Sequence, residues 1–162
     1  MKKTIYAVVF LALLFSSCAN EFNKVYKSTD NNFKYEYAKE CFAKGKYVRA
    51  STLLQGLVTM QKGSDNAQES LYMLGMSEFN SRDYEGASAT FKKYCQSYPK
   101  GAYTEEARFL IGMSLYNCTP EPRLDQSQTV NAIAAFQEYI DLYPDGKQKK
   151  DAQQRLFELQ DK

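Results

Sequence analysis

The sequence predicts an all-α protein in which helical hairpins stack as a right-handed superhelix, an α-solenoid. The composition suits a folded helical chain, because 44% of the 162 residues are hydrophobic, 25% are charged and only 4 are proline. The skeleton of FKKYCQSYPKGAY at 91–103 returns in FQEYIDLYPDGKQ at 136–148, with Phe, Tyr, Tyr, Pro and Gly in the same places. Such repetition, with apolar residues at helical spacing, is typical of hairpins that each bury their apolar side against a copy.

Residues 1–17 have the features of a lipoprotein signal peptide. The basic start MKK precedes an apolar run from Ile5 to Phe15, which is shorter than the roughly 20 residues that a membrane-spanning helix needs. The stretch LFSSCAN resembles a bacterial lipoprotein cleavage box, which implies that Cys18 is lipidated and becomes the first mature residue. An ordinary signal peptide with an incidental cysteine is the alternative.

Residues 18–32 are predicted to form a lipidated tether. A chain that begins at Cys18 has 19 basic and 19 acidic residues, so acyl chains rather than net charge would hold it at a membrane. The polar segment from Ala19 to Asn32 lacks strong periodicity, and it would reach roughly 45 Å if fully extended. Asp30 is expected to cap the first helix of the repeat domain rather than to bind calcium.

Residues 33–162 are predicted to be the repeat domain, with repeats at about 33–65, 66–103 and 104–146 and a lone helix at 147–160. LYMLGMSEFN at 71–80 matches RFLIGMSLYN at 108–117 at an offset of 37. The lone helix would be either a cap on the array or the first helix of a fourth repeat. Positions that correspond across the three repeats hold Tyr35, Tyr72 and Phe109; Ala38, Gly75 and Gly112; Ala50, Ala87 and Ala132; Leu54, Phe91 and Phe136; and Leu57, Tyr94 and Tyr139.

The small residues at mid-helix predict close contacts between helices. A glycine inside a helix costs about 1 kcal/mol relative to alanine, so Gly75 and Gly112 indicate two sites where a second helix must come near. The alanines of the second helices would admit the partner, and Phe91 and Phe136 would fill the space beside them.

Helix ends are marked by capping and turn residues. Gly45 is expected at the turn of the first hairpin, and Asp83 and Thr104 stand where N-caps are wanted. YPKG at 98–101 and YPDG at 143–146 are expected to end helices, because proline cannot continue a helix and glycine supplies the left-handed conformation that exit turns often need.

These positions resemble the tetratricopeptide repeat. In the second unit the resemblance rests on MLGMSEF, DYEGA, ATF and SYP, which hold the Leu-Gly, Ala, Phe and Pro sites of the repeat. The usual tryptophan is replaced by Lys34, Leu71 and Arg108.

The run RLDQSQTVNAIAAFQEYIDLYPDGKQKKDAQQRL resembles the BamD family of outer-membrane β-barrel assembly lipoproteins. The matching positions are Asp125, Gln126, Thr129, Ala132, Phe136, Tyr143 and Pro144. The resemblance implies a non-enzymatic scaffold on the periplasmic face of the outer membrane, held there by lipid. It also implies two partners, namely a barrel-forming BamA-type subunit and unfolded outer-membrane proteins. The family normally has about five repeats, whereas this chain shows three and one further helix.

The first helices of the repeats are expected to line a concave peptide-binding groove. Aromatic and methionine side chains can hold an extended or helical peptide, and asparagines could bind its backbone. Packing between neighbouring hairpins is the alternative for each aromatic, and helix-end capping is the alternative for each asparagine. The expected residues are Tyr35, Lys39, Phe42, Tyr72, Met76, Phe79, Asn80, Phe109, Met113, Tyr116 and Asn117.

The sequence offers no catalytic, metal or cofactor motif. It has no histidine, no phosphate-binding glycine loop and no GxSxG, and its small net charge gives no electrostatic case for nucleic acid. Cys41 and Cys95 are expected to be buried free thiols, while Cys118 could be reactive. The carboxylates expected to be solvated are Glu36, Glu40, Glu69, Glu105 and Glu106.

Two other functions fit an envelope lipoprotein built from such repeats. One is a pilotin that escorts secretin subunits, and the other is an adaptor for cell-envelope synthesis. The longer loop with LDQSQT favours the assembly scaffold over both.

Overall fold

A computed structural model describes residues 21–60, 63, 66–119 and 126–160 of the chain. Within these residues the chain is all-helical and contains no strand, which confirms the predicted fold class. A short helix covers residues 21–26. The helices that follow are α2 (Asn31–Ala43), α3 (Tyr47–Met60), α4 (Ala67–Asn80), α5 (Tyr84–Ser97), α6 (Thr104–Asn117), α7 (Ser127–Leu142) and α8 (Lys149–Gln160).

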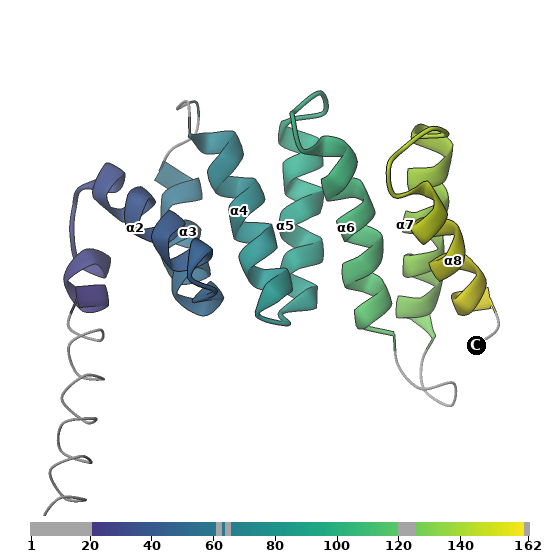
Figure 1. Cartoon of the computed structure of the whole chain (residues 1–162), viewed down its shortest axis with the longest axis horizontal. Helices are drawn as coiled ribbons and strands as arrows, with labels where there is room; N and C mark the ends of the chain where they lie inside the picture. The colour runs from purple at the N-terminus through teal and green to yellow at the C-terminus, as the bar shows by residue number, and fades with distance from the viewer. Residues whose placement is uncertain (1–20, 61–62, 64–65, 120–125, 161–162) are drawn as a thin grey trace, which may run out of the picture.

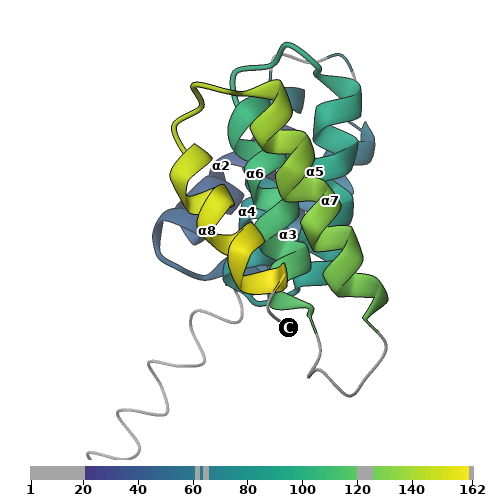
Figure 2. The same cartoon turned by 90° about the vertical axis from the view of Figure 1, so that its right-hand side faces the viewer.

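The helices form two layers along one axis. Consecutive helices pack against each other as antiparallel neighbours from α2 to α8 (Figure 1). The view from the C-terminal end places α4, α6 and α8 in one layer and α5 and α7 in the other (Figure 2). The result is a solenoid of hairpins in which every second helix presents its outer side on the same face of the molecule.

Glycine allows the two helices of a hairpin to come together. A Cβ atom on Gly75 would lie 2.7 Å from Cε1 of Phe91, and one on Gly112 would lie 2.7 Å from Cδ1 of Phe136. Both rings are completely buried, so they have no room to move away. The predicted close approach is confirmed, and each ring lies directly over the glycine.

The alanine positions of the repeat lie in the core. Ala38, Ala50, Ala87 and Ala132 are completely buried. A larger side chain at any of these positions would push neighbouring helices apart, because interiors are packed as densely as organic crystals. The three-fold register read from the sequence therefore corresponds to real packing positions.

Three predicted helix boundaries are confirmed. The Asp30 carboxylate accepts hydrogen bonds from two backbone N–H groups at the start of α2, and Asp83 accepts one from the N–H of Gly86 in α5. Gly45 has a φ of +69° in the turn between α2 and α3, a conformation that favours glycine.

The predicted N-cap role of Thr104 is wrong. Thr104 is the first residue of α6, Tyr103 is its N-cap, and no side chain caps this helix end. The Thr104 hydroxyl donates instead to the carbonyl oxygen of Tyr98, at 2.6 Å. This carbonyl follows the end of α5, so the buried threonine closes the turn between two helices rather than starting one.

The left-handed conformation expected for the glycines of YPKG and YPDG is also wrong. The helices end where predicted, but neither Gly101 nor Gly146 has a positive φ. A Cβ on Gly101 would lie 2.7 Å from the hydroxyl of Tyr94, and a Cβ on Gly146 would lie 2.6 Å from that of Tyr139. Both turns need glycine because a tyrosine hydroxyl occupies the space that a Cβ atom would take.

Each of these hydroxyls fixes the turn above it. The Tyr94 hydroxyl accepts a hydrogen bond from the N–H of Tyr103 at 3.2 Å, and the Tyr139 hydroxyl accepts one from the N–H of Gln148 at 3.1 Å. Buried backbone N–H groups need such acceptors, so one tyrosine in each of the second and third hairpins satisfies the turn that follows the hairpin.

The described part of the predicted tether is not an open chain. Residues 21–26 form a helix, and Val25 on it is completely buried in a cluster that also contains residues of α2 and α3. The guanidinium of Arg49 lies 5.5 Å from the centre of the Phe22 ring on the same helix. Val25 and Phe22 lie three residues apart, so they form one apolar side of the helix. The overall polarity of residues 19–32 did not predict this apolar side.

Helix α8 departs from the pattern of the earlier first helices. Ala152 is completely buried, as is Ala107 forty-five residues before it, so the two helices share a register. In that register Phe157 takes the position of Gly112, and its side chain is 65% exposed. At this position α6 has a glycine against which the Phe136 ring packs, whereas α8 has the exposed ring of Phe157.

Candidate protein-interaction face

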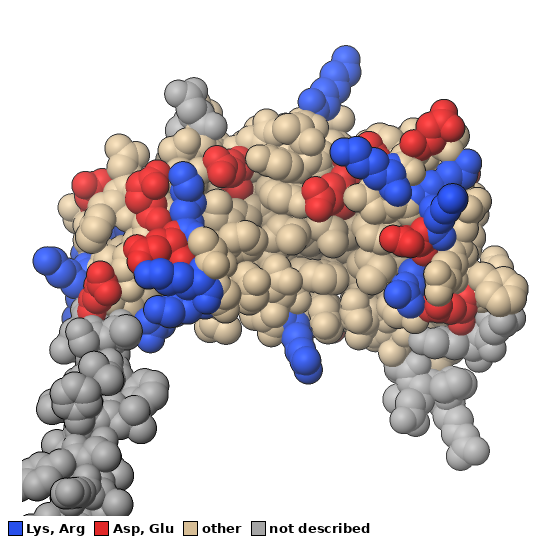
Figure 3. All heavy atoms as spheres, in the orientation of Figure 1, with Lys and Arg blue, Asp and Glu red and all other residues tan. Residues whose placement is uncertain are grey.

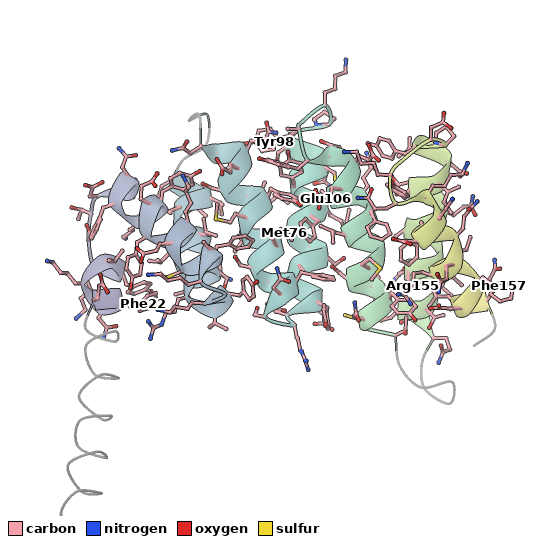
Figure 4. All side chains as sticks on the ribbon, viewed as in Figure 1. Phe22, Met76, Tyr98, Glu106, Arg155 and Phe157 are labelled. Carbon is pink, nitrogen blue, oxygen red and sulfur yellow. The ribbon has the colours of Figure 1, made fainter. Side chains whose placement is uncertain are left out.

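The predicted groove residues belong to the layer formed by α2, α4, α6 and α8, whose outer side is called here the first-helix face. The middle of this face carries few charged groups, whereas acidic and basic side chains gather toward both ends (Figure 3). Met76 on α4 and Glu106 on α6 lie in this middle part (Figure 4). The sequence thus brings most predicted groove residues to one side of the molecule.

On α2, Tyr35 is only 3% exposed, so its ring belongs to the core rather than to an open surface. The Lys39 ammonium lies 5.2 Å from the centre of that ring and 3.5 Å from a carboxylate oxygen of Glu36. Phe42 is half-buried and packs edge-on against Tyr47 of α3. Of the three predicted residues on this helix, Lys39 and Phe42 present surface.

In the second and third repeats, the leading aromatic of the first helix packs against the second helix. The ring of Tyr72 stacks on Tyr103 at 4.3 Å and also contacts Tyr94. The ring of Phe109 contacts Tyr139 at 5.6 Å between centroids. Tyr72 and Phe109 are half-buried, so packing within their own hairpins covers part of each ring and leaves part of it accessible.

The next turn of these helices holds the methionines and the remaining aromatics. Met76, Phe79 and Met113 are half-buried against the core. The hydroxyl of Tyr116 donates to Glu158 of α8 at 2.7 Å. Tyr116 therefore links two first helices as well as presenting part of its ring on the face.

Asn80 and Asn117 are exposed at corresponding helix ends. Each amide Nδ2 donates to a carbonyl oxygen of its own helix, that of Met76 or Met113, at 2.8 Å. This bond holds the side chain against the helix and leaves the amide oxygen as an acceptor. The amide nitrogen of each asparagine thus binds the end of its own helix, as the capping alternative expects. The amide oxygen remains an acceptor that a peptide could use.

Tyrosine–glutamate hydrogen bonds join neighbouring first helices, and the prediction that these carboxylates are merely solvated is wrong. The Tyr35 hydroxyl donates to Glu69 at 2.8 Å. Tyr72 forms the corresponding bond to Glu106, and burial together with this bond raises the pKa of the Tyr72 hydroxyl. The signal was present in the sequence, because both tyrosines and both glutamates recur at the offset of 37.

Glu105 also has a specific partner. Its carboxylate accepts hydrogen bonds from the Tyr139 hydroxyl at 3.2 Å and from the backbone N–H of Lys147 at 2.9 Å. It thereby contacts the turn between α7 and α8. Glu36 and Glu40 face solvent as expected, and they form ion pairs with Lys39 and Lys44 on their own helix.

A hollow on the opposite side was not predicted. It has a volume of about 480 Å³ and opens between α5 and α7, with Ile111 and Leu115 of α6 among the residues that line it. The ion pair between Arg108 and Glu138 borders it. Its lining combines the apolar Ile111 and Leu115 with polar side chains that include Lys92, Cys95 and Asn131.

Glu78 takes the position of Leu115 in the preceding hairpin and is buried there, with 5% of its surface exposed. Burial raises the pKa of this carboxyl, although hydrogen bonds from Thr90 and Gln55 oppose the rise. Its Oε2 atom has no hydrogen-bond partner among the described residues. No pattern in the sequence predicts a buried acid at this position.

The cysteine predictions are confirmed for two positions. Cys41 and Cys95 are buried free thiols, and burial raises the pKa of each. Cys118 is half-buried, and burial raises the pKa of its thiol as well. A raised pKa lowers the thiolate fraction and with it the reactivity of all three.

Cys18, the predicted lipidation site, lies outside the described residues. Every helix within the described ranges is too short or too polar to traverse a bilayer.

Comparison with known proteins agrees with the architecture. The chain is 20% identical over 158 residues to a protein of Caulobacter vibrioides named outer membrane protein assembly factor BamD. The match covers 96% of this chain and 52% of that protein, so the chain spans about half the length of the curated relative it matches.

A family model described as outer membrane lipoprotein, YfiO, matches residues 27–162. This span begins at the end of the N-terminal helix and contains every hairpin of the solenoid. The chain therefore belongs to the YfiO family of outer membrane lipoproteins.

Proposed function

We propose that the protein is a non-enzymatic scaffold of the outer-membrane β-barrel assembly complex. The observation that carries the proposal is the family match over residues 27–162. The name of the Caulobacter relative, an outer membrane protein assembly factor, points to the same process. A solenoid of hairpins suits this role because it offers long surfaces on which several partners can bind at once.

The scaffold is held at the membrane by acyl chains on Cys18 and faces the periplasm. This part of the proposal rests on LFSSCAN and on membership of a lipoprotein family. Two or more acyl chains suffice for stable anchoring. Metabolic labelling with a radioactive or alkyne fatty acid, compared with a Cys18→Ser variant, tests it directly. Equal labelling of both proteins would contradict lipidation at this cysteine.

The proposed partners are a barrel-forming BamA-type subunit and unfolded outer-membrane proteins. Affinity purification of the lipidated protein from detergent-solubilised membranes should recover the barrel-forming subunit. Recovery of a secretin without that subunit would instead identify a pilotin, and recovery of cell-wall synthases would identify an envelope-synthesis adaptor.

Client proteins bind the first-helix face through their C-terminal strand, which alternates aromatic and polar residues. The half-buried Tyr72, Met76 and Met113 offer adaptable apolar contacts, and the amide oxygens of Asn80 and Asn117 can accept hydrogen bonds from a peptide backbone. The middle of the face, which carries few charged groups, suits an apolar segment (Figure 3).

Site-specific crosslinking separates this surface from the rest. A photoreactive residue at position 117 should crosslink to a peptide that copies the last strand of a barrel. The matched control is position 131, because Asn131 is also an exposed asparagine but borders the hollow between α5 and α7. Crosslinks at position 131 without crosslinks at position 117 would place the client on the opposite side and contradict the proposal.

A further inference from the structure

The charges of the protein are separated along the chain. Residues 21–49, which form the N-terminal helix and most of the first hairpin, carry seven basic and four acidic side chains. Residues 50–162 carry twelve basic and fifteen acidic ones. A mature chain with no net charge therefore has a positive first end and a negative remainder.

The positive end is one packed unit. Val25 is completely buried among side chains of α2 and α3, and Phe22 lies beneath the Arg49 guanidinium. The helix of residues 21–26 thus lies against the first hairpin at the end of the array, beside α2 (Figure 1). Its position is set by tertiary packing.

This unit lies close to the predicted lipid. Cys18 precedes Glu21, the first described residue, by three positions, which limits their separation to about 10 Å even in a fully extended chain. Acyl chains on Cys18 would therefore hold this end of the array within reach of the phospholipid headgroups.

Part of the positive charge is free to meet those headgroups. Lys24, Lys27 and Lys46 are exposed and form no ion pair within the part of the chain that the structure describes. Lys39 and Lys44, by contrast, pair with acidic residues of α2. Basic and acidic side chains accordingly appear together at this end of the molecule (Figure 3).

We propose that the helix of residues 21–26 and the first hairpin form an electrostatic contact with anionic phospholipid headgroups. The contact acts together with the lipid on Cys18, so the inference rests on the lipidation proposed above. It holds the positive end of the array against the bilayer, while the acidic remainder is repelled and extends away. A lipid anchor alone would leave the array free to rotate, whereas a second contact fixes which way its faces point.

Vesicle co-sedimentation of the unlipidated protein isolates the electrostatic part. The mature chain with Cys18→Ser keeps every described residue and cannot be acylated. It should bind vesicles of phosphatidylethanolamine and phosphatidylglycerol in low salt, and it should not bind vesicles of phosphatidylethanolamine and phosphatidylcholine. Replacing Lys24, Lys27 and Lys46 by glutamine should weaken the partition coefficient about tenfold or more, since each lysine near an anionic surface contributes appreciably.

The matched control carries the same change in charge elsewhere. Lys93, Lys100 and Lys147 are also exposed but belong to later hairpins, so their replacement by glutamine should leave binding nearly unchanged. Equal losses in the two triple variants, or equal binding to neutral and anionic vesicles, would overturn the proposal. Because this assay needs neither acylation nor the barrel-forming subunit, its failure would leave the proposed scaffold function standing.

Discussion

At Gly75 and Gly112, a missing side chain sets the distance between the two helices of a hairpin. The rings of Phe91 and Phe136 occupy the space that a Cβ atom would need. Gly56, in the interior of α3, has no heavy atom within 4 Å of its would-be Cβ. Two kinds of helical glycine thus occur in one protein, and only the first kind is required by packing.

Gly75→Ala and Gly56→Ala should change stability in opposite directions. The first forces a methyl group into a filled space, so it should lower the free energy of unfolding by about 1–2 kcal/mol after the gain in helix propensity is included. The second should raise it by up to about 1 kcal/mol, because alanine is the better helix former and meets no neighbour. Urea unfolding at neutral pH measures both, and shifts of the same sign would contradict the packing argument.

Glu78 makes stability depend on pH. Its pKa is raised in the folded protein, so the unfolded chain ionises first and the charged carboxylate weakens the fold above the folded pKa. Glu78→Gln should therefore raise the free energy of unfolding by about 1 kcal/mol at neutral pH. The gain should vanish below about pH 4, where the carboxyl is protonated in both states. Thermal melts across this range test the prediction.

Thr90→Val is a second test of Glu78, and it should change stability in the opposite direction from Glu78→Gln. It removes one of the hydrogen bonds that stabilise the charged carboxylate, so it should lower the melting temperature most at neutral pH. A glutamine variant that is less stable than wild type at neutral pH would show that the carboxylate is better satisfied than its geometry indicates.

At the scale of elements, α6 and α8 are joined by a cluster of three side chains. Tyr116 of α6 donates its hydroxyl hydrogen to Glu158, and Arg155 of α8 binds the same carboxylate at 2.8 Å. The hydrogen bond from Tyr116, followed by that from Arg155, lowers the pKa of Glu158 to about 2. The Arg155 guanidinium also lies 5.0 Å from the centre of the Tyr116 ring.

The stability that this cluster contributes should be lost in acid. A carboxylate with a lowered pKa stabilises the fold above its unfolded pKa, and the contribution disappears as the pH falls toward the folded value. Glu158→Gln should therefore melt below wild type at neutral pH, and the gap should close between about pH 4.5 and pH 2. Tyr116→Phe should remove much of the same pH-dependent gap. A gap that is constant with pH would contradict the role of the charge.

The helices and their register could be predicted from the sequence, because apolar spacing and the offset of 37 report packing directly. Turn chemistry could not be predicted in the same way. A glycine in an exit turn looks alike whether it takes a positive φ or makes room for a tyrosine, and only the packed structure distinguishes the two at Gly101.

Site residues divide in a similar manner. The sequence placed Met76 and Asn117 on the first-helix face, because helical register alone decides this. It could not separate the buried Tyr35 from the half-buried Tyr72, because the two tyrosines hold the same position of the repeat. The tyrosine–glutamate hydrogen bonds could have been predicted from the sequence, because both the tyrosine and the glutamate recur at the offset of 37.

On the scale of the whole molecule, each hairpin contacts chiefly its neighbours, so stability should be local. Val25→Ala creates a cavity at the first end, and it should lower the stability of this unit by about 1–2 kcal/mol. Hydrogen exchange should then accelerate in residues 21–43 and remain unchanged in α6, α7 and α8.

Asn23→Ala is the control for this local effect. Asn23 lies on the same short helix with its side chain exposed, so its replacement should leave exchange unaltered. Faster exchange throughout the array in the Val25 variant would show that the solenoid unfolds as a single cooperative unit instead.

The exposed ring of Phe157 limits how closely another helix can pack against α8. A helix that approached α8 as closely as α5 approaches α4 would collide with this ring, because the seat that glycine provides elsewhere is filled. A partner that binds α8 must therefore have a cavity that accommodates the Phe157 ring, or it must pack at a greater distance from the helix. Lengthening the array by copying one of its own hairpins would thus require Phe157→Gly as the first edit.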